Sequence, residues 1–220
     1  MHKSIYSLVL SDEVMEAVDR LAYRRGCNRS QLINQILAEY VSYITPEQKI
    51  REAFGRISSV LDGNEGFRLI TRPSDTMLSL GSALMYKYNP TVRYSVELFR
   101  NTEGALGELR VSTRTQNAAL LATMTQFYQV WDSIECANIG SCGSHWEEGR
   151  YYRPLRLRVN ANAGADAVTP DTVGGLIAGY IRAFDDGLKR YFRLAEDPHT
   201  AMREVERVYK SYLQECTEII

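Results

Sequence analysis

Polar side chains, arginine among them, alternate with apolar ones in three strand-like segments in the second half of the chain. The segments read VRYSVELF from residue 92, ALGELRVSTR from residue 105 and RPLRLRVN from residue 153. Successive strand side chains point to opposite faces, so Arg110 shares one face with Arg114, and Arg156 shares one face with Arg158. A guanidinium fork suits phosphate or carboxylate, which defines a candidate anionic-ligand face: Arg93, Arg110, Arg114, Arg156 and Arg158. The alternative is a solvated polar face, whose ion pairs stabilise little.

A loop rich in glycine, serine and cysteine holds the other residue types that could do chemistry. Cys136, Cys142 and His145 are spaced only loosely like a metal site, because structural zinc sites favour closely spaced cysteine pairs and need four ligands. The run GSCGS does not match the Gly-x-Ser-x-Gly of a nucleophile elbow, and no Walker loop occurs. We therefore expect free thiols, no metal, no cofactor and no enzyme activity.

The whole chain has the composition of an ordinary globular protein. Its 220 residues are 45% hydrophobic and 24% charged with a net charge of −1, so overall charge indicates neither nucleic acid nor membrane as a partner. The longest weakly polar run, at residues 173–181, is too short to span a bilayer, and the N-terminus lacks a signal-peptide pattern. The scattered cysteines favour a cytoplasmic location over a disulfide framework.

The elements that must position these residues begin with a lone strand. Residues 4–10 alternate as a half-buried strand does, but the next clear alternation lies far along the chain. Ser11 then caps a first helix, which ends at Gly26. Asn28 caps a second helix, with Gln31 in the capping-box position. The strand therefore has no neighbouring strand with which to pair inside this unit.

This unit of about forty residues is too small to bury a core alone. Domains of this size usually need a metal, disulfides or a second chain, and the unit has neither a metal-binding cluster nor a cysteine pair. We therefore expect two copies of the strand to pair antiparallel, with four helices closing over the two-stranded ribbon.

The segment from residue 3 to residue 43 resembles a ribbon-helix-helix DNA-binding domain of the Arc/MetJ/CopG type. The shared features are the alternating strand, the first helix, the glycine turn, the polar cap of the Asn-x-Ser kind and the apolar second helix. In that family the ribbon of an intertwined dimer lies in the DNA major groove. The resemblance implies the base-reading residues Lys3, Ile5, Ser7 and Val9. Phosphate would bind where the second helix begins, at Arg24, Arg25, Asn28, Arg29 and Ser30.

The resemblance implies a transcriptional regulator, specifically a repressor, that binds a palindromic operator as a homodimer or tetramer. Two features depart from the family pattern. Ile5 and Val9 offer only apolar contact, for example to thymine methyl groups. Residues 1–44 carry five basic and five acidic side chains, a net charge of zero, which predicts weak non-specific binding with a shallow salt dependence.

Further along the chain, the pattern predicts a linker helix followed by an α+β domain. The predicted domains are residues 1–44, 45–63 and 64–220. A short strand is expected at FRLITR, a hairpin at residues 92–114, and a third strand after the glycine-rich loop. Helices are expected at about residues 76–87, 116–136, 170–194 and from 198 onward. Paired strands with helices between and after them favour an antiparallel sheet covered by helices.

Two other functions stay open. The chain could be a DNA-partition or antitoxin-like adaptor whose second domain binds another protein, or a ligand-binding protein that uses the ribbon only to dimerise. In the regulator, the α+β domain would provide oligomerisation and sense a small anionic effector. Gly175 and Gly179 predict close helix packing. The last helix is a candidate contact between subunits through an apolar stripe: Met202, Val205, Tyr209, Tyr212, Leu213 and Cys216.

Overall fold

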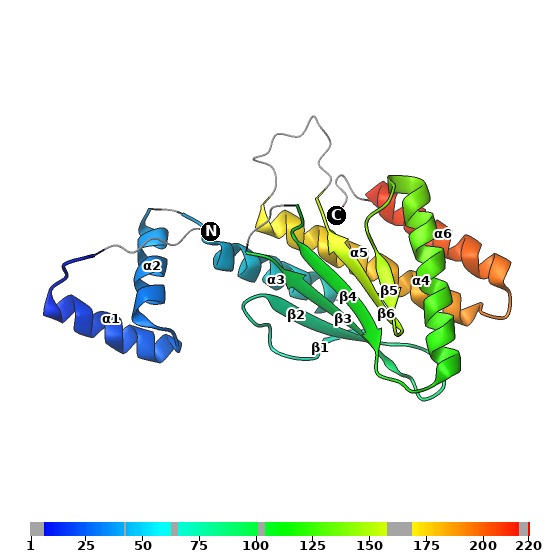
Figure 1. The fold of residues 1–220 in the computed structure, drawn as a ribbon, viewed down its shortest axis with the longest axis horizontal. Coiled ribbons are helices and arrows are strands. Elements are labelled where there is room, and N and C mark those ends of the chain that lie inside the picture. The colour runs from blue at the N-terminus through cyan, green and yellow to red at the C-terminus, as the bar shows by residue number, and fades with distance from the viewer. Residues whose placement is uncertain (1–6, 42, 63–65, 101–103, 158–168, 216–219) are drawn as a thin grey trace. The chain divides into compact units, whose positions relative to one another are not determined.

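Two units make up the part of the chain that the structure describes, residues 7–41, 43–62, 66–100, 104–157, 169–215 and 220 (Figure 1). This computed structural model divides into Met1–Lys49 and Ile50–Ile220. The boundary falls inside helix α3 (Pro46–Asp62). The side chains of α3 that are buried in the core of the second unit are Ile50, Ala53, Phe54, Ile57 and Leu61. The helix expected to link two domains is thus also part of the second one.

The first unit contains a pair of helices, α1 (Asp12–Arg25) and α2 (Arg29–Tyr40). Acidic residues occupy the first turn of α1, where they suit the positive end of the helix dipole. The helix ends at Gly26, whose φ of 63° is a left-handed conformation that glycine adopts without strain. The small core between the helices consists of Val18, Ala22 and Leu32.

The structure describes only the last part, residues 7–10, of the N-terminal strand expected from the sequence. Residues 7–10 are exposed and have no strand structure, while Lys3 and Ile5 lie outside the described residues. A two-stranded ribbon takes its hydrogen bonds from two chains. The ribbon-helix-helix arrangement therefore stays a prediction.

The second unit contains a six-stranded antiparallel sheet, with strand order β1-β2-β3-β4-β6-β5 in its described part. The strands are β1 (Phe67–Leu69), β2 (Met77–Ala83), β3 (Thr91–Leu98), β4 (Gly107–Thr113), β5 (His145–Glu147) and β6 (Arg150–Leu155). Besides α3, the helices are α4 (Ala118–Ile139), α5 (Pro170–Arg193) and α6 (Pro198–Glu215). The α+β class with an antiparallel sheet is confirmed. None of the described helices is both long and apolar enough to cross a membrane.

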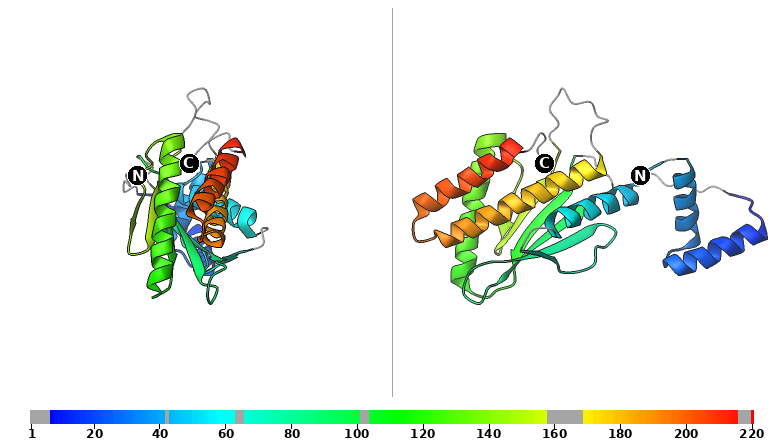
Figure 2. Two further views of the ribbon diagram at one scale, coloured as in Figure 1. Left: turned by 90° about the vertical axis from the view of Figure 1, so that its right-hand side faces the viewer. Right: turned by 180° about the vertical axis from the view of Figure 1, so that it is seen from behind.

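One face of the sheet carries the core of the second unit. Tyr94 of β3 and Tyr151 of β6 lie on this face, and Phe184 of α5 packs against both, with ring centroids 6.2 and 5.2 Å away. Trp131 of α4 contacts Phe184 and also Tyr209 of α6. The left-hand view of Figure 2 shows α5 and α6 together on one side of the sheet. On the opposite face Arg93 is exposed, and Ser95, Glu97 and Arg110 are half-buried.

The prediction of a helix at about residues 76–87 is wrong. Residues Met77–Ala83 form strand β2, which pairs with β3 over its whole length. Leu78 and Leu80 fit strand alternation as well as a helical face, so periodicity does not separate the two structures. Pairing with β3 decides between them. Gly81 permits the close packing, because a Cβ on it would lie 3.0 Å from a methyl group of Thr91.

The prediction that the segment rich in glycine, serine and cysteine, residues 138–150, is a loop is wrong in part, because the segment contains strand β5. Strands β5 and β6 form a hairpin in which Glu147 lies opposite Arg150. The two residues between them, Glu148 and Gly149, have positive φ angles of 49° and 73°, as in the tight turns that match strand twist. The third strand of the expected pattern accordingly starts earlier, at Arg150, and ends at Leu155.

Candidate functional site

The turn between α1 and α2 holds residues that the sequence assigns to phosphate binding. Oδ1 of Asn28 accepts the N–H of Gln31 at 2.9 Å, and Oε1 of Gln31 accepts the N–H of Asn28 at 3.2 Å, which completes the predicted capping box. Arg24, Arg25 and Ser30 are exposed on either side of the turn. An anion at this turn would meet two cations and the positive end of a helix dipole.

Arg29, the remaining phosphate-binding candidate, is engaged with Asp19 of α1. Its Nε and Nη2 donate to the two carboxylate oxygens of Asp19 at 2.7 and 2.5 Å. These hydrogen bonds lower the pKa of Asp19 and raise the pKa of Arg29. Arg24 and Arg25, by contrast, make no ion pair with a carboxylate of the described residues. Those two side chains are the better candidates for phosphate contact.

The first unit also leaves many large apolar side chains in solvent. Leu37 is 51% exposed and Tyr40 is 89% exposed, although both lie on α2 among its apolar residues. The exposed apolar surface of the first unit consists of Leu8, Val9, Leu10, Val14, Tyr23, Ile36, Leu37, Tyr40, Val41, Tyr43 and Ile44. Of the four base-reading candidates, Ser7 and Val9 are described, and both are exposed. An apolar surface of this extent is typical of an interface.

The sheet of the second unit places two of the predicted arginines on its outer face. Arg110 of β4 pairs with Glu108 at 3.3 Å, and its guanidinium lies 5.1 Å from the ring centre of Tyr152. His145 stacks on the same Tyr152 ring at 4.8 Å. Arg93 of β3 is exposed and makes no ion pair with a described carboxylate. The two arginines thus differ in how free they are to bind an anion.

The other members of the candidate anionic-ligand face lie beyond the strand ends. Arg114 follows β4 and Arg156 follows β6; both are exposed, and neither pairs with a carboxylate in the ranges that the structure describes. Arg158 lies outside those ranges. The structure therefore places Arg93, Arg110, Arg114 and Arg156 on or beside the sheet.

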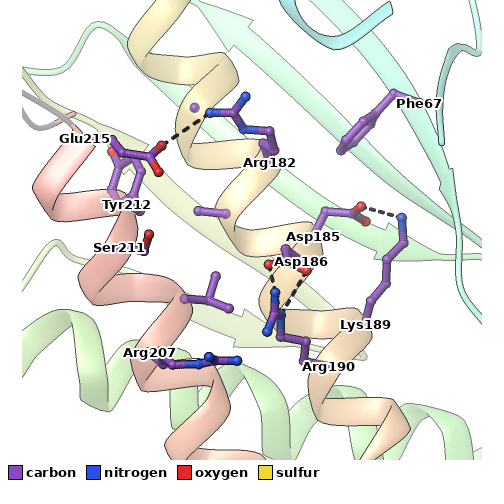
Figure 3. Close-up of a pocket in the computed structure, with 13 residues that line it drawn as sticks. Phe67, Arg182, Asp185, Asp186, Lys189, Arg190, Arg207, Ser211, Tyr212 and Glu215 are labelled. Carbon is purple, nitrogen blue, oxygen red and sulfur yellow. Dashed lines mark hydrogen bonds and ion pairs between the residues drawn. The ribbon is translucent and has the colours of Figure 1, made fainter. Parts of the chain in front are cut away.

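A groove of about 890 Å³ lies between α5 and α6 in the second unit (Figure 3). Its charged side chains are paired with one another in close contacts: Arg182–Glu215 at 3.7 Å, Lys189–Asp185 at 2.7 Å, Arg190–Asp186 at 3.1 Å, Arg190–Glu204 at 3.2 Å and Arg207–Glu204 at 2.5 Å. Each cation of the groove has a carboxylate partner. An anionic ligand would have to displace these partners in order to bind.

The buried carboxylate of the groove, Asp185, ties α5 to the sheet. It accepts hydrogen bonds from the Tyr94 hydroxyl at 2.9 Å and from the Ser82 hydroxyl at 3.1 Å, and Lys189 lies 2.7 Å away. Burial and the neighbouring Asp185 charge raise the pKa of Tyr94. A carboxylate with three donors around it is well satisfied, so we assign Asp185 a structural role.

A second buried charge, which the sequence patterns did not reveal, lies between α4 and β6. Nε and Nη2 of Arg153 donate to Oε1 of Glu135 at 3.1 and 2.9 Å, and both side chains are 1% exposed. The Tyr180 hydroxyl donates to Glu135 at 3.2 Å and accepts from Trp131 Nε1 at 2.9 Å. The available signal was that Arg153 lies on the apolar side of its strand, between Tyr151 and Leu155.

The cysteine-rich loop and the helix before it hold Cys142 and Cys136 as thiols, not as a disulfide. Burial, followed by the charge of Asp132, raises the pKa of Cys136. His145 belongs instead to the stack on the outer face of the sheet. Among the residues that the structure describes, no group of three or more His, Cys, Asp or Glu side chains is arranged to hold a metal ion.

Comparison with known proteins does not place the chain in a family. No protein-family model matches it, and neither a curated protein nor a solved structure matches it. The ribbon-helix-helix resemblance therefore depends on the residue pattern of the N-terminal segment alone.

Proposed function

We propose that this protein is a dimeric, sequence-specific DNA-binding regulator of transcription, a repressor whose first unit is a ribbon-helix-helix domain. The observation that carries the proposal is the incomplete core of the first unit. Val18, Ala22 and Leu32 form its buried cluster and Ala38 is also buried, while a larger set of apolar side chains among the described residues of the unit is exposed. A surface of this kind is costly in water unless a partner covers it.

A second copy of the same chain is the partner that fits this surface. Residues 7–10 are exposed and carry leucine at every second position, Leu8 and Leu10. Antiparallel pairing with the same residues of a twin would satisfy their backbone N–H and C=O groups. It would also turn Leu8 and Leu10 toward the helices and leave Ser7 and Val9 on the opposite face.

DNA binding follows from what the paired ribbon would present. Ser7 and Val9, with Lys3 and Ile5 outside the described residues, form the face that would read base edges in the major groove. The turn before α2 offers Arg24 and Arg25 to the phosphate backbone beside it. Phosphate contacts of this kind position a protein on DNA, and base contacts supply the specificity.

The test is a binding titration of the full chain on a labelled duplex from upstream of its own coding sequence, repeated at several salt concentrations. Replacing both Arg24 and Arg25 by alanine should weaken binding to all duplexes alike and reduce the log–log salt slope by about 0.9 for each phosphate that an arginine no longer neutralises. Ser7→Ala should instead lower the preference for the upstream duplex over a scrambled one, by roughly 1 kcal/mol.

The matched control is Arg203→Ala, which removes an exposed arginine from α6 and should leave duplex binding unchanged. Equal affinity of the wild type for the upstream and scrambled duplexes would rule out sequence-specific binding at this locus. Unchanged binding by both N-terminal variants would show that the assigned DNA face is wrong.

A further inference from the structure

The outer face of the sheet changes charge from one end to the other. In the strand register, Arg68 of β1 lies opposite Gly81 of β2, and Gly81 lies opposite Arg93 of β3. Four residues further along β3, Glu97 lies directly opposite Glu108 of β4. One end of the face therefore carries arginines, with a glycine that has no side chain between two of them, and the other end carries paired acids.

The arginines of this end, which we term the basic end, are unpaired. It consists of Arg68, Arg93, Arg114 and Arg150, all of them exposed. Arg68 donates to the Thr91 hydroxyl at 3.2 Å, and none of the four makes an ion pair with a carboxylate of the described residues. The nearest acid in the register is Glu147, opposite Arg150, and the two do not pair. In the groove between α5 and α6, by contrast, every cation has a carboxylate partner.

An exposed tyrosine lies at the same end of the sheet, in the loop that joins β2 to β3. Tyr88 is 90% exposed and has a φ of 68°, a left-handed conformation that costs energy in a residue with a Cβ. Asn89 also has a positive φ, and the Lys87 ammonium lies 5.3 Å from the centre of the Tyr88 ring. Tyr86 anchors the loop by an edge contact with Phe192, at 5.7 Å. The loop thus holds an aromatic ring and a cation in solvent.

We propose that the basic end and Tyr88 together bind single-stranded nucleic acid. The arginines would contact successive phosphates, and a base would stack on the tyrosine ring. Neighbouring strands are about 4.8 Å apart, so the arginines on β1, β3 and β6 extend over about 19 Å. That length suits a chain of phosphates better than one small anion. This inference concerns the second unit and holds whether or not the first unit binds duplex DNA.

The test measures binding of the full chain to a labelled, unstructured oligonucleotide, with a duplex and heparin as further probes. Replacing Arg93 and Arg114 by alanine should weaken oligonucleotide binding at least about tenfold at low salt and reduce the salt slope by about 0.7 per arginine. Tyr88→Ala should weaken oligonucleotide binding about tenfold and leave heparin binding unchanged, because heparin has no bases to stack.

Arg203→Ala on α6 is the matched control and should bind the oligonucleotide like the wild type. An equal loss in this control would show that binding depends only on general charge and would overturn the proposal. A wild type that binds heparin or duplex but not the oligonucleotide would overturn it as well. Loss of oligonucleotide binding on replacing Arg24 and Arg25 would move the site to the first unit. If replacing Arg24 and Arg25 abolishes duplex binding but not oligonucleotide binding, the single-strand site stays assigned to the sheet. Each of the two proposals can therefore be rejected without the other.

Discussion

In the second unit, Trp131 and Phe184 are fully buried among side chains from the sheet and several helices. In the first unit, α2 buries Leu32 but leaves Leu37 and Tyr40 largely exposed. Size accounts for the contrast, because a short helix pair cannot enclose an apolar core, whereas a domain of the second unit's length can. The contrast supports the proposal that the first unit pairs with a second copy of the chain.

The largest effect is expected from breaking the buried ion pair of the second unit. Glu135→Gln removes the Glu135 charge from the buried guanidinium of Arg153, which keeps its hydrogen bond to the Ile220 oxygen, and should lower the free energy of unfolding by roughly 3–5 kcal/mol. Urea unfolding followed by the fluorescence of the buried Trp131 measures the change. Replacing both partners by apolar residues, Glu135→Leu with Arg153→Met, should restore most of the loss. A loss below about 1 kcal/mol in the single variant would show that the pair contributes little.

A smaller loss is expected where two helices of the second unit approach closely. A Cβ at Gly174 of α5 would lie 2.6 Å from the main-chain oxygen of Ala53 in α3, so Gly174→Ala should destabilise the unit by about 1–3 kcal/mol. Gly175→Ala is the matched control, since its Cβ would lie 3.9 Å from the nearest atom, at Arg56. Thermal unfolding of both variants makes the comparison. Equal melting temperatures would contradict the close helix contact.

For the first unit, the expected effect is on association and not on folding of the second unit. Leu37→Glu places a charge on the exposed apolar surface and should raise the dissociation constant of the proposed dimer at least about tenfold. The reason is that the substitution removes the free energy gained when the interface buries a leucine side chain. Light scattering over a concentration series measures this. Met85→Glu, at an exposed apolar position of the loop that joins β2 to β3, is the control that should leave association unchanged. If the dimer dissociates in the control variant and not in Leu37→Glu, the dimer contact lies on the second unit.

The smallest effect concerns the exposed pair between α1 and α2. The hydrogen bonds from Arg29 lower the pKa of Asp19, so the pair stabilises the folded unit above the ordinary carboxyl pKa of about 3.9. That contribution is lost as pH falls through the lowered pKa, and it is small because both side chains are exposed. An NMR titration of the Asp19 carboxyl should show its pKa rising in Arg29→Ala. An unchanged pKa would show that the pair does not persist in solution.

The sequence predicts best those features that depend on neighbours along the chain. The capping box of Asn28 and Gln31 is confirmed, and so is the start of α5, where the Thr169 side chain accepts the N–H of Thr172. The glycine end of α1 is also as expected. Caps and turns are formed by residues within four positions of one another, so local spacing is sufficient to recognise them.

The features that the sequence predicts poorly depend on residues distant in the chain. Strand β2 was expected as a helix because its apolar residues fit both periods, and only pairing with β3 separates them. The charge of Asp185 is satisfied by Ser82 and Tyr94, about a hundred residues earlier. The pairing of Arg153 with Glu135 likewise crosses from a strand to a helix. Strand register and helix packing bring these groups together, and neither is visible in local spacing.

The sequence by itself therefore determined the helices α1 to α6, the alternation of β3 and β4 and the α+β class of the second unit, because these follow from local hydrogen bonding and from hydrophobic period. Tertiary structure decided which charges that lie far apart in the sequence neutralise one another. It paired Arg182 with Glu215 and Arg190 with Glu204 between α5 and α6, and it left the arginines at one end of the sheet without a carboxylate partner among the described residues. The reason is that an ion pair requires two charges within a few ångströms, and that distance is set by the packing of the chain.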